Sequence, residues 1–158
     1  MRSADTSPPI KKAIIFIGIP ASGKSSFYAE FFRDGYTHIN LDTLHTRKKE
    51  SILFINCLQA CESFVVDNTN TRKSDRQRYI VPAKEAGYYV IGYFFQSILS
   101  DCIVRNQARS GKNRISDIAI SSKSKELELP CAEEGFDELY FVKLNDGEFI
   151  IEKWRDDM

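Results

Sequence analysis

Short apolar runs alternate with segments of helical periodicity along the whole chain. The apolar runs predict strands over 13–18, 37–40, 64–66, 88–95 and 138–144. Between them, the spacing of apolar residues predicts helices over about 25–34, 43–62, 74–86 and 98–109, followed by a polar helix over 115–125. Such alternation is typical of an α/β fold with a mostly parallel central sheet and helices on both faces.

Turn and capping signals set the expected ends of these elements. Ser74 followed by Gln77 resembles a capping box that opens a helix, and Gly87 is placed to end that helix. An Asn-Asp-Gly turn at 145–147 predicts a hairpin that pairs the last strand with residues 148–154. In the predicted helix over 43–62, Phe54, Cys57, Leu58 and Cys61 share one face.

The segment between the first predicted strand and the first predicted helix reads GIPASGKSS. Its spacing, Gly-x-x-x-x-Gly-Lys-Ser, is that of the loop that wraps the phosphates of ATP or GTP. Strand, glycine-rich loop and helix follow in the order that this motif requires, and inward-facing amides and the helix N-terminus attract phosphate oxygens. We therefore predict a nucleotide site at Gly18, Ile19, Pro20, Ala21, Ser22, Gly23, Lys24, Ser25 and Ser26.

Individual residues of this loop have separate expected tasks. Gly18 and Gly23 are expected to adopt backbone conformations that a side chain would forbid. Lys24 would reach the β- and γ-phosphates, and the hydroxyl of Ser25 would hold Mg²⁺. ATP and Mg²⁺ are therefore the predicted cofactors.

Length and composition limit the classes of function. The 158 residues suit one domain over 13–158, preceded by a disordered leader over 1–12. Lys plus Arg equals Asp plus Glu at 22 each, so nucleic acid could be attracted only by a local patch of charge. No apolar run approaches the ~20 residues of a membrane span, and the first residues lack the apolar core of a signal peptide.

The four cysteines, Cys57, Cys61, Cys102 and Cys131, are expected to be reduced thiols, mostly buried. The spacing of Cys57 and Cys61 could suit a metal, but no second pair or nearby histidine supports that interpretation. Free thiols and the absence of a targeting segment predict a cytoplasmic protein.

Two aspartates follow predicted strands, at the edge of the sheet where α/β proteins bind ligands. Asp42 could orient an acceptor hydroxyl and accept its proton, or it could cap the helix that begins at Thr43. Asp67 could support Mg²⁺, directly or through water, or it could simply form a turn in the sequence DNTN. A third interpretation is that Asp67, Asn68 and Asn70 hold other groups of the site by hydrogen bonds.

Basic residues concentrate in two parts of the chain. Arg105, Arg109, Lys112 and Arg114 form a stretch without an acidic residue, which is either a solvated helix end or part of a lid over about 105–126 that closes on the triphosphate. Arg105 and Arg109 are the predicted nucleotide contacts of that lid. A groove for a polyanionic substrate could be lined by Lys48, Lys49, Arg72, Lys73, Arg76 and Arg78.

Five segments of the chain resemble polynucleotide 5′-hydroxyl kinases in order and spacing. They read GIPASGKSSF, INLDTL, VVDNTNTRKSDRQRYI, RNQARSGK and LELPCAEEGFDELYFV, and together they span about 13–144. The phosphate loop is shared by a large superfamily, whereas Asp-Asn-Thr-Asn with the later Glu-Gly-Phe is much narrower. The resemblance implies the three-layer fold of P-loop NTPases, with a mostly parallel sheet and a helical lid.

The resemblance also implies roles for single residues. Asp42 matches the general base of the family, Lys24 and Ser25 match the phosphate and magnesium residues, and Arg109 matches the lid arginine. Residues 67–70 match a segment that supports the active site. Members of the family commonly have arginine at the position of Leu41, and some also have arginine at the position of His45; both positions face the substrate in that family. Their replacement puts specificity for nucleic acid in question.

The sequence as a whole predicts an ATP- and Mg²⁺-dependent kinase that phosphorylates a hydroxyl, with the 5′-OH of a DNA or RNA strand as the leading acceptor. A small-molecule kinase acting on a sugar, nucleoside or antibiotic is an alternative, favoured by the net charge and by Leu41. A non-catalytic nucleotide-binding switch is another alternative, although a switch needs no base such as Asp42. No membrane partner or obligate protein partner is expected.

Overall fold

The computed structural model describes residues 10–158, except for the side chain of Lys112. Most of the predicted leader therefore lies outside the described residues. The centre of the fold is a six-stranded sheet with the order β2-β3-β1-β4-β5-β6. Its strands are β1 (Lys12–Ile17), β2 (Thr37–Ile39), β3 (Phe64–Val66), β4 (Tyr89–Phe95), β5 (Glu138–Asn145) and β6 (Glu148–Lys153). The first five strands are parallel and β6 is antiparallel to β5.

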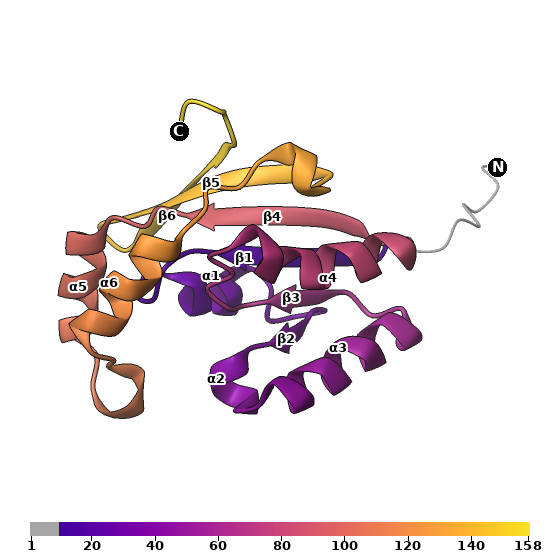
Figure 1. Ribbon diagram of the computed structural model, residues 1–158, viewed down its shortest axis with the longest axis horizontal. Coiled ribbons are helices and arrows are strands. Elements are labelled where there is room, and N and C mark those ends of the chain that lie inside the picture. The colour runs from indigo at the N-terminus through magenta and orange to yellow at the C-terminus, as the bar shows by residue number, and fades with distance from the viewer. Residues whose placement is uncertain (1–9) are drawn as a thin grey trace, which may run out of the picture.

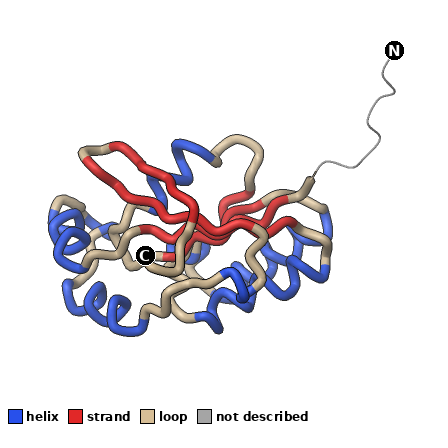
Figure 2. The backbone as a smooth tube through the Cα atoms, turned by 90° about the horizontal axis from the view of Figure 1, so that it is seen from above, coloured by secondary structure: helices blue, strands red, loops and turns tan. Residues whose placement is uncertain are grey.

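Helices cover both faces of this sheet, as Figures 1 and 2 show. They are α1 (Lys24–Phe31), α2 (Leu41–Leu44), α3 (Arg47–Ala60), α4 (Lys73–Glu85), α5 (Leu99–Gln107) and α6 (Asp117–Glu126). Two short 3₁₀ segments lie at Gly111–Asn113 and Ala132–Glu134. In Figure 1, β4 points toward α5 and α6, which lie together beyond the carboxyl end of the strand. This arrangement confirms the predicted three-layer α/β fold.

Alternate residues of β1 pack in two separate hydrophobic cores, one on each face of the sheet. Ile14 and Phe16 pack with Phe27 of α1 on one face, where an aromatic cluster forms. Ile15 faces the opposite core, which also contains Phe54 of α3. Because β1 is buried on both sides, its sequence is a continuous apolar run, as expected for a central parallel strand.

The predicted helix over 43–62 is wrong, because the chain breaks it in two. His45 ends α2 in the left-handed region, with φ of 69°. The side chain of Thr46 then caps α3 by accepting a hydrogen bond of 3.1 Å from the Lys49 N–H. The break separates a short helix that carries Asp42 from the long helix that packs on the core. Of the face predicted for this segment, Cys61 is exposed.

The predicted capping box at Ser74 and Gln77 is also wrong. Helix α4 begins at Lys73, and the carboxylate of Asp75 accepts a hydrogen bond of 3.2 Å from the Arg72 N–H. Gln77 instead donates to the carbonyl of Glu134 at 2.8 Å. An acidic residue in the first turn of α4 thus takes the place of the predicted cap.

Two of the predicted turns are confirmed. Gly87 has φ of 82°, a conformation that favours glycine, and follows Ala86, the C-cap residue of α4. Asp146 and Gly147 both have positive φ, at 51° and 79°, in the hairpin between β5 and β6. This backbone geometry is the one expected of a two-residue hairpin turn.

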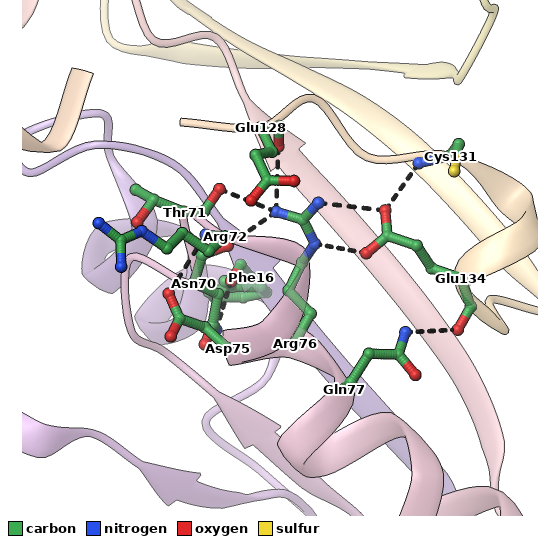
Figure 3. A network of polar contacts seen from close by, with 10 residues as sticks. All are labelled: Phe16, Asn70, Thr71, Arg72, Asp75, Arg76, Gln77, Glu128, Cys131 and Glu134. Atoms are coloured by element: carbon green, nitrogen blue, oxygen red, sulfur yellow. Dashed lines mark hydrogen bonds and ion pairs between the residues drawn. The ribbon is translucent and has the colours of Figure 1, made fainter. Parts of the chain in front are cut away.

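A buried arginine joins three distant segments of the chain (Figure 3). Arg76 of α4 is fully buried, and its guanidinium donates to both carboxylate oxygens of Glu134, at 2.7 and 3.1 Å. It also donates to the carbonyls of Asn70 (2.9 Å), Thr71 (3.2 Å) and Glu128 (3.1 Å). The hypothesis that Arg76 lines a groove for a polyanion is therefore wrong, since none of its side chain is exposed.

Within residues 10–158, no helix combines the length and the apolar character needed to cross a lipid bilayer.

We predict that Arg76→Ala lowers the free energy of unfolding by about 3 kcal/mol or more, because it leaves the buried carboxylate of Glu134 without its partner. Urea denaturation measures the change. Arg78→Ala on the same helix is the matched control, because Arg78 is exposed, and it should change stability by no more than about 0.5 kcal/mol. Similar values for the two variants would contradict the role given to Arg76.

Candidate active site

A cleft opens beyond the carboxyl ends of the parallel strands, where the predicted site residues meet. Its walls come from the phosphate loop, from the turns that follow β2 and β3, and from the segment between α5 and α6. Among the predicted site residues, the lining includes Pro20, Ala21, Lys24, Ser25, Asp42, Asp67 and Arg109. The other predicted nucleotide contacts, Gly18, Ile19, Ser22, Gly23, Ser26 and Arg105, do not line this cleft.

The glycines of the phosphate loop are required for two different reasons. Gly23 has φ of 103°, which a side chain would rarely allow. Gly18 is needed for space, since a Cβ at this position would lie 2.7 Å from Ser22 Oγ and 3.0 Å from Phe95 Cβ. The expectation of a special backbone conformation thus applies to Gly23, while Gly18 allows close packing against β4. Ile19 donates its amide to Ser97 Oγ at 3.1 Å, and its side chain is buried.

Lys24 lies at the start of α1 with its amine turned back onto the loop. Its Nζ donates to the carbonyls of Gly18 (3.0 Å) and Ile19 (2.9 Å) and to Ser22 Oγ (3.4 Å). Burial lowers the pKa of Lys24 from 10.5 to about 8, although the nearby carboxylate of Asp67 opposes part of this effect. The loop therefore holds a cationic group in a place where an anion would stabilise its charge.

Asp67 receives hydrogen bonds from two elements at the end of β3. Its Oδ2 accepts from Ser25 Oγ at 3.0 Å and lies 2.8 Å from His38 Nε2. The ring of His38 stacks on Tyr28, with 3.8 Å between ring centroids. A hydroxyl and a carboxylate at this distance are oxygen ligands of the kind that Mg²⁺ prefers, so Ser25 and Asp67 fit a magnesium ion.

Asp42 lies in the first turn of α2 but does not cap that helix. The cap is Asn40, whose Oδ1 accepts a hydrogen bond of 3.0 Å from the Thr43 N–H. Asn40 also donates to the carbonyl of Asp67 at 2.7 Å, which fixes the start of α2 against β3. The capping interpretation of Asp42 is therefore wrong. Its exposed carboxylate lines the cleft and bonds to none of the described residues.

Asn68 links the backbone beside Asp42 to a buried carboxylate. Its Oδ1 accepts from the Leu41 N–H at 2.9 Å, and its Nδ2 donates to Glu50 Oε2 at 2.8 Å. Glu50 is 1% exposed and also accepts a hydrogen bond from the hydroxyl of Tyr79. This network fixes the position of α2 relative to the end of β3.

Asn70 and Thr69 connect the same turn to the phosphate loop. Asn70 has φ of 44° and donates to the carbonyl of Phe16 at 2.8 Å. The Gly18 N–H donates to the Thr69 carbonyl at 3.0 Å. The geometry therefore supports the hypothesis that this segment holds other groups of the site by hydrogen bonds.

The two lid arginines lie in different environments. Arg109 follows α5, is exposed and lines the cleft, and its guanidinium donates to the carbonyl of Asn113 at 3.4 Å. Arg105 instead lies against the phosphate loop, where it donates to the carbonyls of Ala21 (3.3 Å) and Leu144 (3.5 Å). Arg109 is thus placed to meet a bound molecule, whereas Arg105 supports the loop.

Two groups of residues near the site were not predicted from the sequence. His38 and Asn40 could have been found from the alternation of β2, which puts both on one side of the strand and Ile39 on the other. Glu50 lies on the buried face of α3 with Phe54 and Cys57. A charged residue at a position that the helical spacing assigns to the core could have indicated its role. Its partners Tyr79 and Asn68 are distant in sequence and gave no local signal.

The cysteines do not form part of the site. Cys57 and Cys102 are buried, Cys131 is partly buried and Cys61 is exposed, and all four are free thiols. In the part of the chain that the structure describes, no three residues among His, Cys, Asp and Glu cluster in a way that could hold a metal.

Two curated relatives match nearly the whole chain. A putative bifunctional polynucleotide phosphatase/kinase of Acanthamoeba polyphaga mimivirus is 32% identical over 157 residues, covering 94% of this chain and 37% of the relative. The bifunctional polynucleotide phosphatase/kinase of Schizosaccharomyces pombe is 28% identical over 153 residues, covering 91% of this chain and 37% of the relative. The chain thus spans little more than a third of the length of these relatives. No protein-family model matches it.

Among solved structures, a gluconokinase from Sinorhizobium meliloti shares the fold. Its TM-score is 0.60 at 19% identity, and the match covers 86% of this chain and 84% of that one. At such low identity the likeness shows the fold alone. The comparisons confirm the predicted resemblance to polynucleotide kinases and the predicted P-loop kinase fold, and they support the interpretation of the chain as a kinase.

The lowered pKa of Lys24 predicts that ATP binding takes up a proton above pH 8. At pH 9 most of the Lys24 amine is neutral, and the triphosphate would favour its charged form, so up to about 0.9 proton should bind with ATP. Titration calorimetry at pH 9 in two buffers of different ionisation enthalpy measures this uptake. At pH 7 the amine is already protonated, which makes that titration the control. Equal enthalpies in the two buffers at pH 9 would contradict the prediction.

Proposed function

Because the chain is a relative of polynucleotide phosphatase/kinases with the fold of a P-loop kinase, we propose that it transfers the γ-phosphate of ATP to the 5′-hydroxyl of a DNA or RNA strand. One observation carries this proposal. The carboxylate of Asp42 lines the same cleft as Lys24 and Ser25 and is free of other bonds to described residues. A nucleotide-binding site alone would not require such a group.

Each residue of the cleft has a separate task in the proposed reaction. Lys24 and the loop amides bind the β- and γ-phosphates, and Ser25 and Asp67 would hold Mg²⁺, which neutralises phosphate charge when bound. Asp42 orients the acceptor hydroxyl and accepts its proton. The acceptor oxygen bonds to the γ-phosphorus as the bond from that phosphorus to the β,γ-bridging oxygen breaks, and ADP leaves.

Arg109 would contact the transferring group from the lid. It lies at the edge of the cleft after α5, and its flexible side chain is exposed. A guanidinium near the γ-phosphate spreads the charge that develops during transfer. Asn106, which is buried, holds the base of this segment by bonding to the N–H (3.1 Å) and carbonyl (2.6 Å) of Ile115.

A small-molecule kinase is the second candidate function. The net charge of zero and the apolar Leu41 beside Asp42 favour it, because a long polyanion gains little from such a surface. Transfer of ³²P from ATP to oligonucleotides, run beside a panel of nucleosides and sugars, decides between the two. Labelling of a small hydroxyl compound but of no oligonucleotide would support the kinase activity and contradict the proposal of a nucleic-acid acceptor.

Asp42→Asn should retain ATP affinity within about twofold while lowering kcat at least a hundredfold, since proton acceptance is needed mainly in the transition state. Calorimetry gives the affinity and the transfer assay gives kcat. Loss of ATP binding would instead assign Asp42 to metal or structure. Unchanged turnover would favour a switch or another base.

Arg109→Ala should lower kcat on the order of a thousandfold if the side chain reaches the transferring phosphate. Arg114→Ala is the matched control, because Arg114 is also exposed in the lid segment but does not line the cleft. It should change kcat only a few-fold. Small and equal effects at both positions would leave Arg109 as a solvated surface charge.

A further inference from the structure

Two arginines, Arg47 and Arg72, line the cleft that contains Asp42, and they have different partners. Arg72 pairs with Glu126 at 3.1 Å, and the same carboxylate also binds Lys123 at 2.7 Å. Arg72 is therefore already paired with a carboxylate of the protein. Arg47, the first residue of α3, lines the cleft as well, and its side chain is 51% exposed.

Arg47 is fixed through only one of its nitrogen atoms. Its NH1 donates to Glu50 Oε1 at 2.9 Å and to the Tyr79 hydroxyl at 3.1 Å. Its Nε and NH2 bond to no residue that the structure describes. The side chain thus has a fixed position but keeps donors available for a ligand, and the planar guanidinium of arginine suits the two oxygens of a phosphate.

The residues that hold Arg47 are also connected to the backbone beside Asp42. Glu50 binds Arg47 through Oε1 and Asn68 through Oε2, at 2.9 and 2.8 Å. Asn68 in turn accepts from the Leu41 N–H at 2.9 Å. A ligand held by Arg47 would therefore be held in a fixed relation to α2, the helix that carries Asp42.

We propose that Arg47 is a specificity-determining residue, which binds the internucleotide phosphate nearest to the 5′-hydroxyl of the acceptor. This inference rests on the proposed function and narrows it to acceptors that carry a phosphate one nucleoside away from the reacting oxygen. One well-placed arginine is compatible with a chain of zero net charge, because it recognises a single phosphate and needs no extended basic surface.

The test combines a change in the protein with a change in the acceptor. Two 5′-OH oligonucleotides are compared, one with an ordinary first phosphodiester and one with an uncharged methylphosphonate at that linkage. For the unmodified protein, the neutral linkage should raise KM about tenfold or more, since a hydrogen bond to a charged group contributes about 1.5–3 kcal/mol. Arg47→Ala should raise KM for the phosphodiester by a similar factor and should no longer distinguish the two acceptors.

Matched controls separate this role from a structural one. Arg33→Ala changes an exposed arginine outside the cleft lining and should keep full discrimination between the linkages. Arg47→Lys keeps the charge without the planar fork and should discriminate to an intermediate degree. The KM for ATP should be nearly unchanged in all three variants, whereas Arg47→Ala should also lower the melting temperature, because the buried carboxylate of Glu50 loses its cationic partner.

Each alternative outcome overturns the inference in a recognisable way. If Arg47→Ala still distinguishes the two linkages as well as the unmodified protein does, Arg47 only supports Glu50. A loss of kcat on both acceptors without a change in discrimination has the same meaning. If the unmodified protein labels no oligonucleotide but labels a small hydroxyl compound, the proposed acceptor is wrong, and the role of Arg47 falls with it.

Discussion

The polar turn that follows β3, residues 67–71, bonds to every other part of the candidate site. Asp67 meets Ser25 and His38, Asn68 meets the backbone next to Asp42, and Asn70 meets the carbonyl of Phe16 in β1. The lid is attached to the same turn, because Thr71 Oγ1 donates to Glu126 Oε1 at 2.8 Å. The guanidinium of Arg76 also fixes the backbone of this segment, because it donates to the carbonyls of Asn70 and Thr71. Rigid placement of one buried turn therefore sets the positions of the phosphate loop, the base and the lid together.

The buried charged residues of the candidate site lie at the end of the cleft where the nucleotide would bind. Lys24 and Asp67 are almost fully buried, and the pKa of Lys24 is lowered chiefly by burial. A bound triphosphate would stabilise the Lys24 cation that burial disfavours, so the cost of burying this amine in the fold is offset when the ligand binds. Asp42 and Arg109, which would act on the transferring group, are instead exposed on movable side chains at the edge of the cleft.

Local patterns in the sequence were enough to predict the strands, the phosphate loop and the position of Asp42, because these depend on neighbours in the chain. The break at His45 could not be predicted in this way, because Asn40, which caps the short helix before it, is held by a hydrogen bond of 2.7 Å to the distant carbonyl of Asp67. The burial of Arg76 depends on Glu134, 58 residues away, and its charge alone suggested a surface position. Long-range hydrogen bonds, rather than local propensity, decide these features.

In the proposed reaction, the turn after β3 places Asp42 against the acceptor hydroxyl beside the γ-phosphate. A crystal structure of the Asp42→Asn variant with Mg²⁺, a non-hydrolysable ATP analogue and a short 5′-OH oligonucleotide tests it most directly. The predicted result is a 5′-oxygen within hydrogen-bond distance of the side chain at position 42 and facing the γ-phosphorus opposite the leaving oxygen. A 5′-end bound away from position 42, with another side chain next to the hydroxyl, would contradict the account.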